Sequence, residues 1–269
     1  MLPIISSSEL REINKAIEEG LDSLEVSLDL GINKTKVKLE KKAFIINDQI
    51  IKTKKIKEDD KSCYLITENG LEKVQFIVND FGKFYKLVPT QFRPILKISG
   101  TSMHKKEFLN KLQKDKLYGE ILDSGTGLGY SAIIVSKTAN KVITVEIDEN
   151  VIEIAKLNPY SQELFNSRTI KRIIGNICEE IKKFKEKEFN FVILDGGSVK
   201  GSEEFFSLEN YKQVFRVLKH DGKLYHYVPN HQIKRGRDFA TEIISRLQKS
   251  GFRDIFRDKE GSFLIAKKF

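Results

Sequence analysis

The residues EILDSGTGLGY, positions 120–130, join a short apolar run to three glycines placed at every second position. The run ends at Asp123, and Gly125, Gly127 and Gly129 follow it. Glycine permits a sharp turn and a close approach of the backbone to a ligand. The pattern predicts a strand, a turn and a helix. It leaves three uses open: a phosphate loop, a loop for a cofactor without phosphates, or a plain connection.

The spacing disfavours both phosphate-binding loops. A P-loop needs a Gly-Lys-Ser/Thr ending, which is absent, and the dinucleotide pattern G-x-G-x-x-G places its third glycine one position later. Asp123 would repel phosphates but attract an ammonium group. S-adenosylmethionine (SAM) has no phosphate and carries an amino group and a sulfonium. We therefore expect Asp123 and the three glycines to bind SAM, with a capping or turn role as the alternative for Asp123.

From Tyr118 onward, apolar strands alternate with helical segments near 130–138, 149–157, 177–184, 207–219 and 237–250. This alternation predicts a parallel sheet covered by helices on both faces. The last residues, GFRDIFRDKEGSFLIAKKF, hold two strand-like pieces joined by KEG, which predicts a hairpin. An α/β sheet of Rossmann-like topology that ends in an antiparallel hairpin is the arrangement of class I methyltransferases.

The first hundred residues follow a different pattern. Residues 7–20 predict a short helix that Ser8 can cap, and short alternating segments rich in β-branched and aromatic residues fill the stretch to Gly100. We expect a small, mostly antiparallel β domain over residues 1–100 with a short leading helix. The SAM-binding domain is expected over residues 101–269.

The net charge of +9 is unevenly distributed, because residues 212–269 hold 14 basic and 6 acidic residues. Such a surface suits RNA, although a solvated lysine-rich surface is an equal alternative. Two distant cysteines and four scattered histidines predict no metal site. No apolar run is long enough for a membrane span, and the N-terminus lacks a signal-peptide core, so we expect a cytoplasmic protein. No feature predicts an oligomeric state.

The ends of later predicted strands carry further polar candidates, and in a parallel sheet these ends meet at one edge. Glu146, 23 positions after Asp123, is expected to accept both ribose hydroxyls, with Ile147 beside it. Asn176, or the backbone of Ile177, is expected to read the adenine edge. Asp195 ends the fourth strand, at the border of the cofactor and substrate regions, and Gly196 and Gly197 follow on the substrate side. For each of these residues a turn or surface role is the alternative.

Together these strand ends resemble class I SAM-dependent methyltransferases, and the closer resemblance is to archaeal predicted methyltransferases related to tRNA adenine methyltransferases. It covers almost the whole chain and includes LDLGINKTKVKLE, FYKLVPT, ILDSGTGLGYSAI, VITVEIDENVIEIAKLNPYSQELF and FSLENYKQVFRVLKHDGKLYHYV. The resemblance implies a SAM-dependent methyltransferase acting on RNA, with tRNA processing as its role. One departure is Asp195-Gly196-Gly197 in place of the Asp-Pro-Pro typical of that group. This departure leaves the methylated atom open.

For this chemistry, Asp195 is the candidate that orients or deprotonates the nucleophile, and His226 is a second catalytic candidate near the end of the fifth strand. His104 is expected to cover the cofactor. The remaining substrate candidates lie beside the expected mouth of the site, where basic side chains can contact RNA phosphates: Asn230, Lys234, Arg235 and Arg237.

Two other hypotheses stay open. Polyamine synthases, which are aminopropyltransferases, also place a small β domain before this sheet and use an aspartate after the fourth strand. Their Gly-Gly-Gly-Asp-Gly loop is absent here, and a basic surface suits a polycationic product poorly. A non-catalytic SAM- or RNA-binding protein is the third hypothesis, and we expect the RNA methyltransferase.

Overall fold

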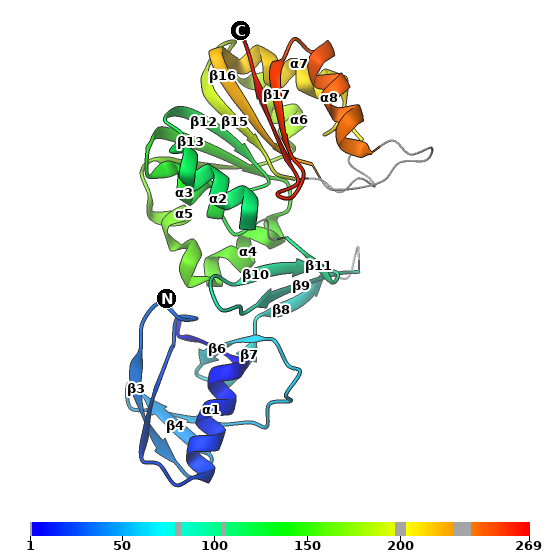
Figure 1. Cartoon of the computed structure of the whole chain (residues 1–269). Helices are drawn as coiled ribbons and strands as arrows, with labels where there is room; N and C mark the ends of the chain where they lie inside the picture. The colour runs from blue at the N-terminus through cyan, green and yellow to red at the C-terminus, as the bar shows by residue number, and fades with distance from the viewer. Residues whose placement is uncertain (1, 79–81, 104–105, 197–202, 229–237) are drawn as a thin grey trace. The chain divides into compact units, whose positions relative to one another are not determined.

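The computed structural model describes residues 2–78, 82–103, 106–196, 203–228 and 238–269. The chain forms two compact units (Figure 1). The first comprises Met1–His104 together with Glu153–Gln162, and the second comprises Lys105–Ile152 and Glu163–Phe269. The predicted division into domains at residue 100 remains a prediction.

Three small antiparallel sheets make up most of the first unit. Their strand orders are β1-β6-β7, β2-β3-β4-β5 and β11-β10-β9-β8. Their bounds are β1 (Ile4–Ser6), β2 (Ser23–Val26), β3 (Thr35–Glu40), β4 (Ala43–Ile46), β5 (Gln49–Lys52), β6 (Cys63–Thr67), β7 (Gly70–Lys73), β8 (Gln75–Val78), β9 (Lys83–Val88), β10 (Ile95–Ile98) and β11 (Thr101–Ser102).

Helix α1 (Ser7–Glu18) packs an apolar stripe into the core of this unit. Leu10, Ile13 and Ala16 recur at helical spacing and are buried against strand residues such as Phe44. The cap differs from the prediction. Ser6, rather than Ser8, accepts the backbone N–H of Glu9 at 3.1 Å, because Ser6 still has extended backbone while Ser8 is already helical.

The second unit is built on a seven-stranded sheet of order β14-β13-β12-β15-β16-β18-β17. The first five strands in this order are parallel, and the last two are antiparallel to their neighbours. The bounds are β12 (Gly119–Ser124), β13 (Ala139–Glu146), β14 (Ile170–Ile174), β15 (Phe189–Leu194), β16 (Leu218–Tyr227), β17 (Arg253–Asp258) and β18 (Phe263–Lys267).

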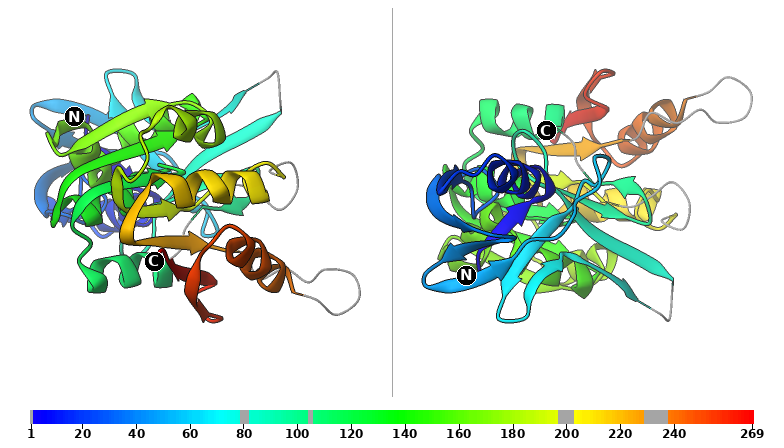
Figure 2. Two further views of the ribbon diagram at one scale, coloured as in Figure 1. Left: turned by 90° about the horizontal axis from the view of Figure 1, so that it is seen from above. Right: turned by 90° about the horizontal axis from the view of Figure 1, so that it is seen from below.

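Helices cover both faces of this sheet, and Figure 2 shows α7 and α8 on one side and α2 on the other. The bounds are α2 (Lys106–Asp115), α3 (Tyr130–Ser136), α5 (Gln162–Asn166), α6 (Ile177–Glu180), α7 (Leu208–Val217) and α8 (Phe239–Lys249), while α4 (Glu149–Leu157) begins in this unit and ends in the first. Short 3-10 turns occupy Pro159–Ser161 and Ile181–Lys183. The predicted helix at 177–184 is therefore α6 followed by a tighter turn.

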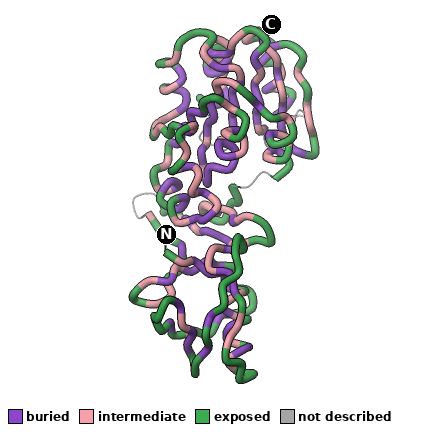
Figure 3. The backbone as a smooth tube through the Cα atoms, turned by 90° about the vertical axis from the view of Figure 1, so that its left-hand side faces the viewer, coloured by how far each residue is buried: buried purple, intermediate pink, exposed green. Residues whose placement is uncertain are grey.

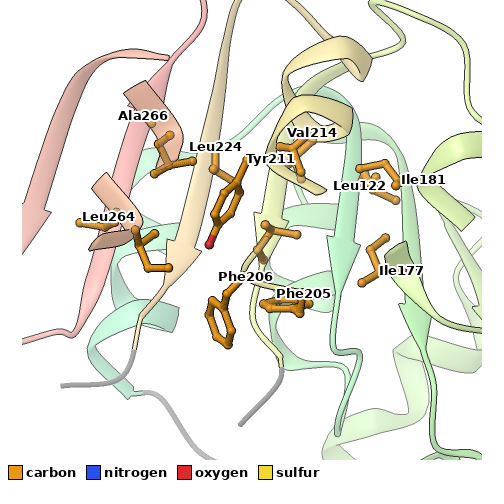
Figure 4. Packing of buried hydrophobic residues seen from close by; sticks show 14 of the residues in the cluster. Leu122, Ile177, Ile181, Phe205, Phe206, Tyr211, Val214, Leu224, Leu264 and Ala266 are labelled. Atoms are coloured by element: carbon orange, nitrogen blue, oxygen red, sulfur yellow. The ribbon is translucent and has the colours of Figure 1, made fainter. Parts of the chain in front are cut away.

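The larger core of this unit lies between the sheet and helices α6, α7 and α8 (Figure 4). Leu122, Val192, Leu194 and Leu224 point to this face, and the strands are purple for much of their length in Figure 3. Side chains alternate between faces along a strand. Asp123, directly after Leu122, therefore points to the opposite face, toward α3.

Candidate functional site

The glycine loop follows β12 and opens α3, as the spacing predicts. Gly125, Gly127 and Gly129 have φ angles of +74°, +57° and +80°, all in the left-handed region that favours glycine. Gly125 is the most constrained, because a Cβ there would collide with the backbone carbonyl of Asp195. Its N–H donates to the Val145 carbonyl at 2.9 Å. The carboxyl ends of β12, β13 and β15 therefore meet at this glycine.

Glu146, the last residue of β13, is held by backbone donors. Its Oε2 accepts the N–H of Gly127 at 3.0 Å, and its Oε1 accepts the N–H of Asp148 at 3.0 Å. Burial raises the pKa of Glu146, and these hydrogen bonds oppose that rise. The residue is 8% exposed and lines the cavity, so the strand end presents an oriented acid to the space beside the glycine loop.

A cavity of about 210 Å³ opens at this edge of the sheet, entirely within the second unit. It brings together many of the residues that the sequence analysis singled out. Of these, Gly125, Glu146, Ile147, Asn176, Ile177 and Gly196 line it. Val145, Gly175, Cys178, Glu204 and Phe205, which sequence reasoning missed, complete the wall.

The cavity wall is acidic and apolar. Glu146 and Glu204 are its charged side chains, and the described lining includes no lysine or arginine. Burial raises the pKa of the Cys178 thiol to about 11, with the nearby charges of Glu204 and Glu179 adding to the effect. The thiol therefore stays protonated near neutral pH and is a poor nucleophile. The wall suits a cationic or neutral ligand with an apolar face.

Asn176 caps helix α6 rather than facing the cavity with its oxygen. Its Oδ1 accepts the N–H of Cys178 at 3.0 Å, and its Nδ2 approaches Oε2 of Glu204 at 3.4 Å. Asparagine is a favoured cap because its side-chain oxygen satisfies a free N–H of the first turn. The amide oxygen predicted to read adenine is therefore already used, while the amide nitrogen is directed toward Glu204.

Asp123 lies beneath the glycine loop and is fully buried. Its Oδ2 accepts the Thr144 hydroxyl at 2.6 Å, and Thr144 in turn accepts the Thr126 hydroxyl at 2.6 Å. Burial raises the pKa of Asp123 to about 7, hydrogen bonds from Thr144 and Ser131 oppose this, and the charges of Asp195 and Glu146 add to it. The predicted contact with a ligand ammonium needs correction, because no part of this side chain reaches the surface.

His226 is also fully buried, within β16. Its Nδ1 lies 3.1 Å from the Leu194 carbonyl and so carries the proton, and its Nε2 accepts the Tyr211 hydroxyl at 2.9 Å. Burial lowers the pKa of His226 to about 4, with the hydrogen bond to Leu194 opposing the fall. A neutral ring packed against Phe205 and Phe206 ties β15 to β16, so the predicted catalytic role is corrected to a structural one.

Asp195 follows β15, where its N–H donates to the Ser124 carbonyl at 3.2 Å. Asp195 is half-buried, and its negative charge adds to the rise in the pKa of Asp123. Gly196, the next residue, lines the cavity. The other predicted substrate residues lie outside the described residues: His104, Gly197, Asn230, Lys234, Arg235 and Arg237.

The missed residues Glu204 and Phe205 lie in the connection from β15 to α7, just before Ser207, which caps α7 by accepting the N–H of Asn210 at 3.1 Å. The sequence does offer one signal for these residues. In SEEFFS, two acids and two aromatic residues precede the capping serine. It does not distinguish Glu204 from its neighbour Glu203. In the part of the chain that the structure describes, no cluster of metal ligands occurs, and no helix is long and apolar enough to cross a membrane.

Comparisons with known proteins point away from the predicted group of methyltransferases. Residues 120–240 match the model of the spermine/spermidine synthase domain. A polyamine aminopropyltransferase of Thermoplasma volcanium is 27% identical over 140 residues, which cover 51% of this chain and 48% of that protein. Its counterpart in Saccharolobus solfataricus is 25% identical over 154 residues, which cover 55% and 48%.

Solved structures show the same fold. Spermidine synthase from Thermotoga maritima aligns with a TM-score of 0.59 at 20% identity, covering 72% of this chain and 71% of that one. A spermidine synthase in complex with the transition-state analogue AdoDATO gives the same TM-score and identity, over 70% and 71%. The predicted Rossmann-like fold, with its antiparallel hairpin and preceding β region, is confirmed.

These matches overturn four predictions: the relation to tRNA adenine methyltransferases, methyl transfer, SAM as methyl donor and an RNA partner. Two physical reasons explain the error. The glycine loop and the acids at the strand ends indicate where a ligand can approach the sheet, and they carry no information on the group that is transferred. The charge of +9 is a property of the whole surface, whereas the described cavity wall is acidic.

A relative that matches over most of its length is the uncharacterized protein MJ1233 of Methanocaldococcus jannaschii. The two are 38% identical over 269 residues, which cover 91% of this chain and 90% of that one. Both units are included in so long a match. The chain belongs to the same family as this archaeal protein.

Proposed function

We propose that this protein is an aminopropyltransferase of the spermidine/spermine synthase type. It transfers an aminopropyl group from decarboxylated SAM to the amine of a small diamine or polyamine. The observation that carries the proposal is the match of residues 120–240 to the spermine/spermidine synthase domain, because every residue lining the cavity falls within that range.

The charges on the cavity wall support this donor over intact SAM. Decarboxylated SAM is cationic at its sulfonium and its amine, and it lacks the carboxylate of SAM. Glu146 and Glu204 favour such a cation, and the described lining offers no basic side chain to pair with a carboxylate.

The adenosine part of the donor has candidate partners in the same wall. Glu146 is oriented by the N–H groups of Gly127 and Asp148, and a carboxylate held this way can accept two ribose hydroxyls. Ile177 and Phe205 offer apolar surface to a planar base, and both are buried. The residues present therefore fit the donor.

When bound, the donor supplies a carbon made electrophilic by the sulfonium, and displacement by an amine leaves 5′-methylthioadenosine. The chain itself needs to align the amine and accept its proton. Asp195 is our candidate for both tasks, because it directly follows β15 at the edge where Gly125 and Gly196 border the cavity. A carboxylate there also attracts the cationic amine that is to react.

The chain departs from the Gly-Gly-Gly-Asp-Gly loop of polyamine synthases, since Leu128 stands between Gly127 and Gly129. Leu128 is buried, so the loop itself presents no carboxylate at that position. In our proposal the negative charge that favours the donor comes from Glu146, Glu204 and Asp195 instead.

The direct test supplies decarboxylated SAM with putrescine, spermidine or other small amines and follows the products by mass spectrometry. We expect an amine longer by one aminopropyl unit and an equal amount of methylthioadenosine. Intact SAM with the same amines is the matched control and should give neither product. Failure to lengthen any amine, under conditions where the donor binds, would reject the proposal.

A further inference from the structure

Glu204 lies on the cavity wall, and the proposed function uses only its negative charge and not its hydrogen-bonding capacity. It belongs to the connection between β15 and α7, yet its carboxylate is turned toward the loop that follows β14, where Nδ2 of Asn176 lies 3.4 Å from its Oε2. The contact joins segments 28 residues apart. A long-range contact of this kind fixes which part of the cavity the acid faces.

That part is the end of the cavity next to Glu146. In the sheet, β14 lies beside β13, and Gly175 donates its N–H to the Glu146 carbonyl at 2.9 Å. If Glu146 holds a ribose, the loop at Gly175–Cys178 is where the attached base lies, since ligands of open α/β sheets lie across the carboxyl ends of neighbouring strands. Glu204 faces this loop.

The other side-chain acceptors at this end have roles of their own, since Asn176 caps α6 and Glu146 is the proposed partner of the ribose. Oδ1 of Asn176 accepts the N–H of Cys178, and both oxygens of Glu146 accept backbone N–H groups. Among the residues that the structure describes, Asn176 makes the one hydrogen bond recorded to the Glu204 carboxylate, and at 3.4 Å it is long. Glu204 is exposed at the cavity, so its oxygens have room for a ligand donor.

We infer that Glu204 is the residue that selects adenine, by accepting a hydrogen bond from the 6-amino group of the base. This inference rests on the proposed function, which supplies the adenosyl donor. A carboxylate has only acceptors, so it attracts a 6-amino group and repels the 6-oxo group of hypoxanthine. The Asn176 amide holds the carboxylate in place by donating to it, because its own oxygen is committed to the helix cap.

Specificity for the base can be measured without turnover. The test uses calorimetric binding of 5′-methylthioadenosine, the expected product, and of its inosine counterpart, which differs only at position 6. We expect the wild type to bind the adenine compound about tenfold more tightly or better, as a hydrogen bond to a charged group provides. Glu204→Gln should bring the two affinities to within about threefold, because an amide can rotate to donate to the 6-oxo group.

Glu203→Gln is the matched control. It removes the same charge from the neighbouring exposed residue, which does not line the cavity, and it should keep the wild-type preference. An unchanged preference in Glu204→Gln, with the wild type still binding the adenine compound, would overturn the inference and leave the proposed function standing. A wild type that binds neither nucleoside would overturn both the inference and the adenosyl donor.

Discussion

Two neighbouring layers inside the parallel part of the sheet and the ends of its strands use similar side chains in opposite ways. Asp123 is paired in register with Thr144, and His226 with Leu194, so both lie inside the sheet and are fully buried. Glu146 is the last residue of β13, where it is paired with Ile174 of β14 but lies past the end of β12, and Asp195 follows the end of β15. Glu146 lies two residues after Thr144, the partner of Asp123, and Asp195 lies one residue after Leu194, the partner of His226. A shift of one or two residues along a strand therefore separates a buried structural side chain from one that can contact a ligand.

The comparison also separates their hydrogen-bond partners. Inside the sheet, Asp123 is surrounded by hydroxyls of Thr144 and Ser131, and His226 by the Tyr211 hydroxyl and a carbonyl. At the end of β13, Glu146 accepts N–H groups of the turning backbone. Backbone donors become available only where the ladder of the sheet ends, which is also where a ligand can approach.

The largest effect is expected for a residue beyond the sheet. Asp195→Asn keeps the shape of the side chain but removes the proton acceptor, so the turnover number should fall about 10²- to 10⁴-fold. Calorimetry with methylthioadenosine should show affinity within about threefold of wild type, since Asp195 does not line the cavity. Asp254→Asn, on the exposed edge of β17, is the control and should leave both quantities unchanged. A variant with normal turnover would remove Asp195 from the chemistry.

Asp123 should instead affect stability and its pH dependence. Its folded pKa is about 7 against 3.8 for the free side chain. The stability that this proton gives is fully present below pH 3.8 and is lost as pH rises through 7, a change of about 4 kcal/mol. Asp123→Asn should abolish this slope in urea unfolding series at pH 5 and pH 8, while nucleoside affinity changes little. Loss of nucleoside binding without a change in slope would return Asp123 to the ligand site.

The sequence predicts the features of this fold that depend on residues close together in the chain, and it misses those that depend on contacts between distant residues. The glycine loop, the strand–helix alternation and the terminal hairpin are local patterns, and each occurs where the sequence predicts it. Strand order and register are not local, and it is the pairing of Asp123 with Thr144 that buries the acid. Glu204 reaches the cavity through a contact with Asn176, 28 residues away, which no spacing in the sequence indicates.

His226, like Asp123, should affect the pH dependence of stability, but in the opposite direction. Burial holds its folded pKa at about 4 against 6.5 for the free side chain. The neutral ring gives stability that is full above pH 6.5 and is lost as pH falls through 4, a change of about 3 kcal/mol. His226→Asn should unfold more easily at all pH values because packing is lost, but without this acid-side slope. A shift in the pH profile of turnover, rather than of unfolding, would contradict the structural role.

Glu146 provides the most direct test of where buried structural side chains end and ligand-binding side chains begin, although the expected loss of affinity is smaller than the effects above. Glu146→Gln keeps one acceptor oxygen but loses the charge, so affinity for methylthioadenosine should fall about tenfold to hundredfold, as expected for a hydrogen bond to a charged group. Glu149→Gln, three residues further along in the exposed first turn of α4, is the matched control and should bind normally.

The two variants Asp123→Asn and Glu146→Gln together locate the edge of the ligand site. Asp123 and Glu146 point to the same face of the sheet, two register positions apart. Equal loss of affinity in both variants would mean that the ligand contacts both positions. A loss confined to Glu146→Gln would place the boundary of the site between Thr144 and Glu146.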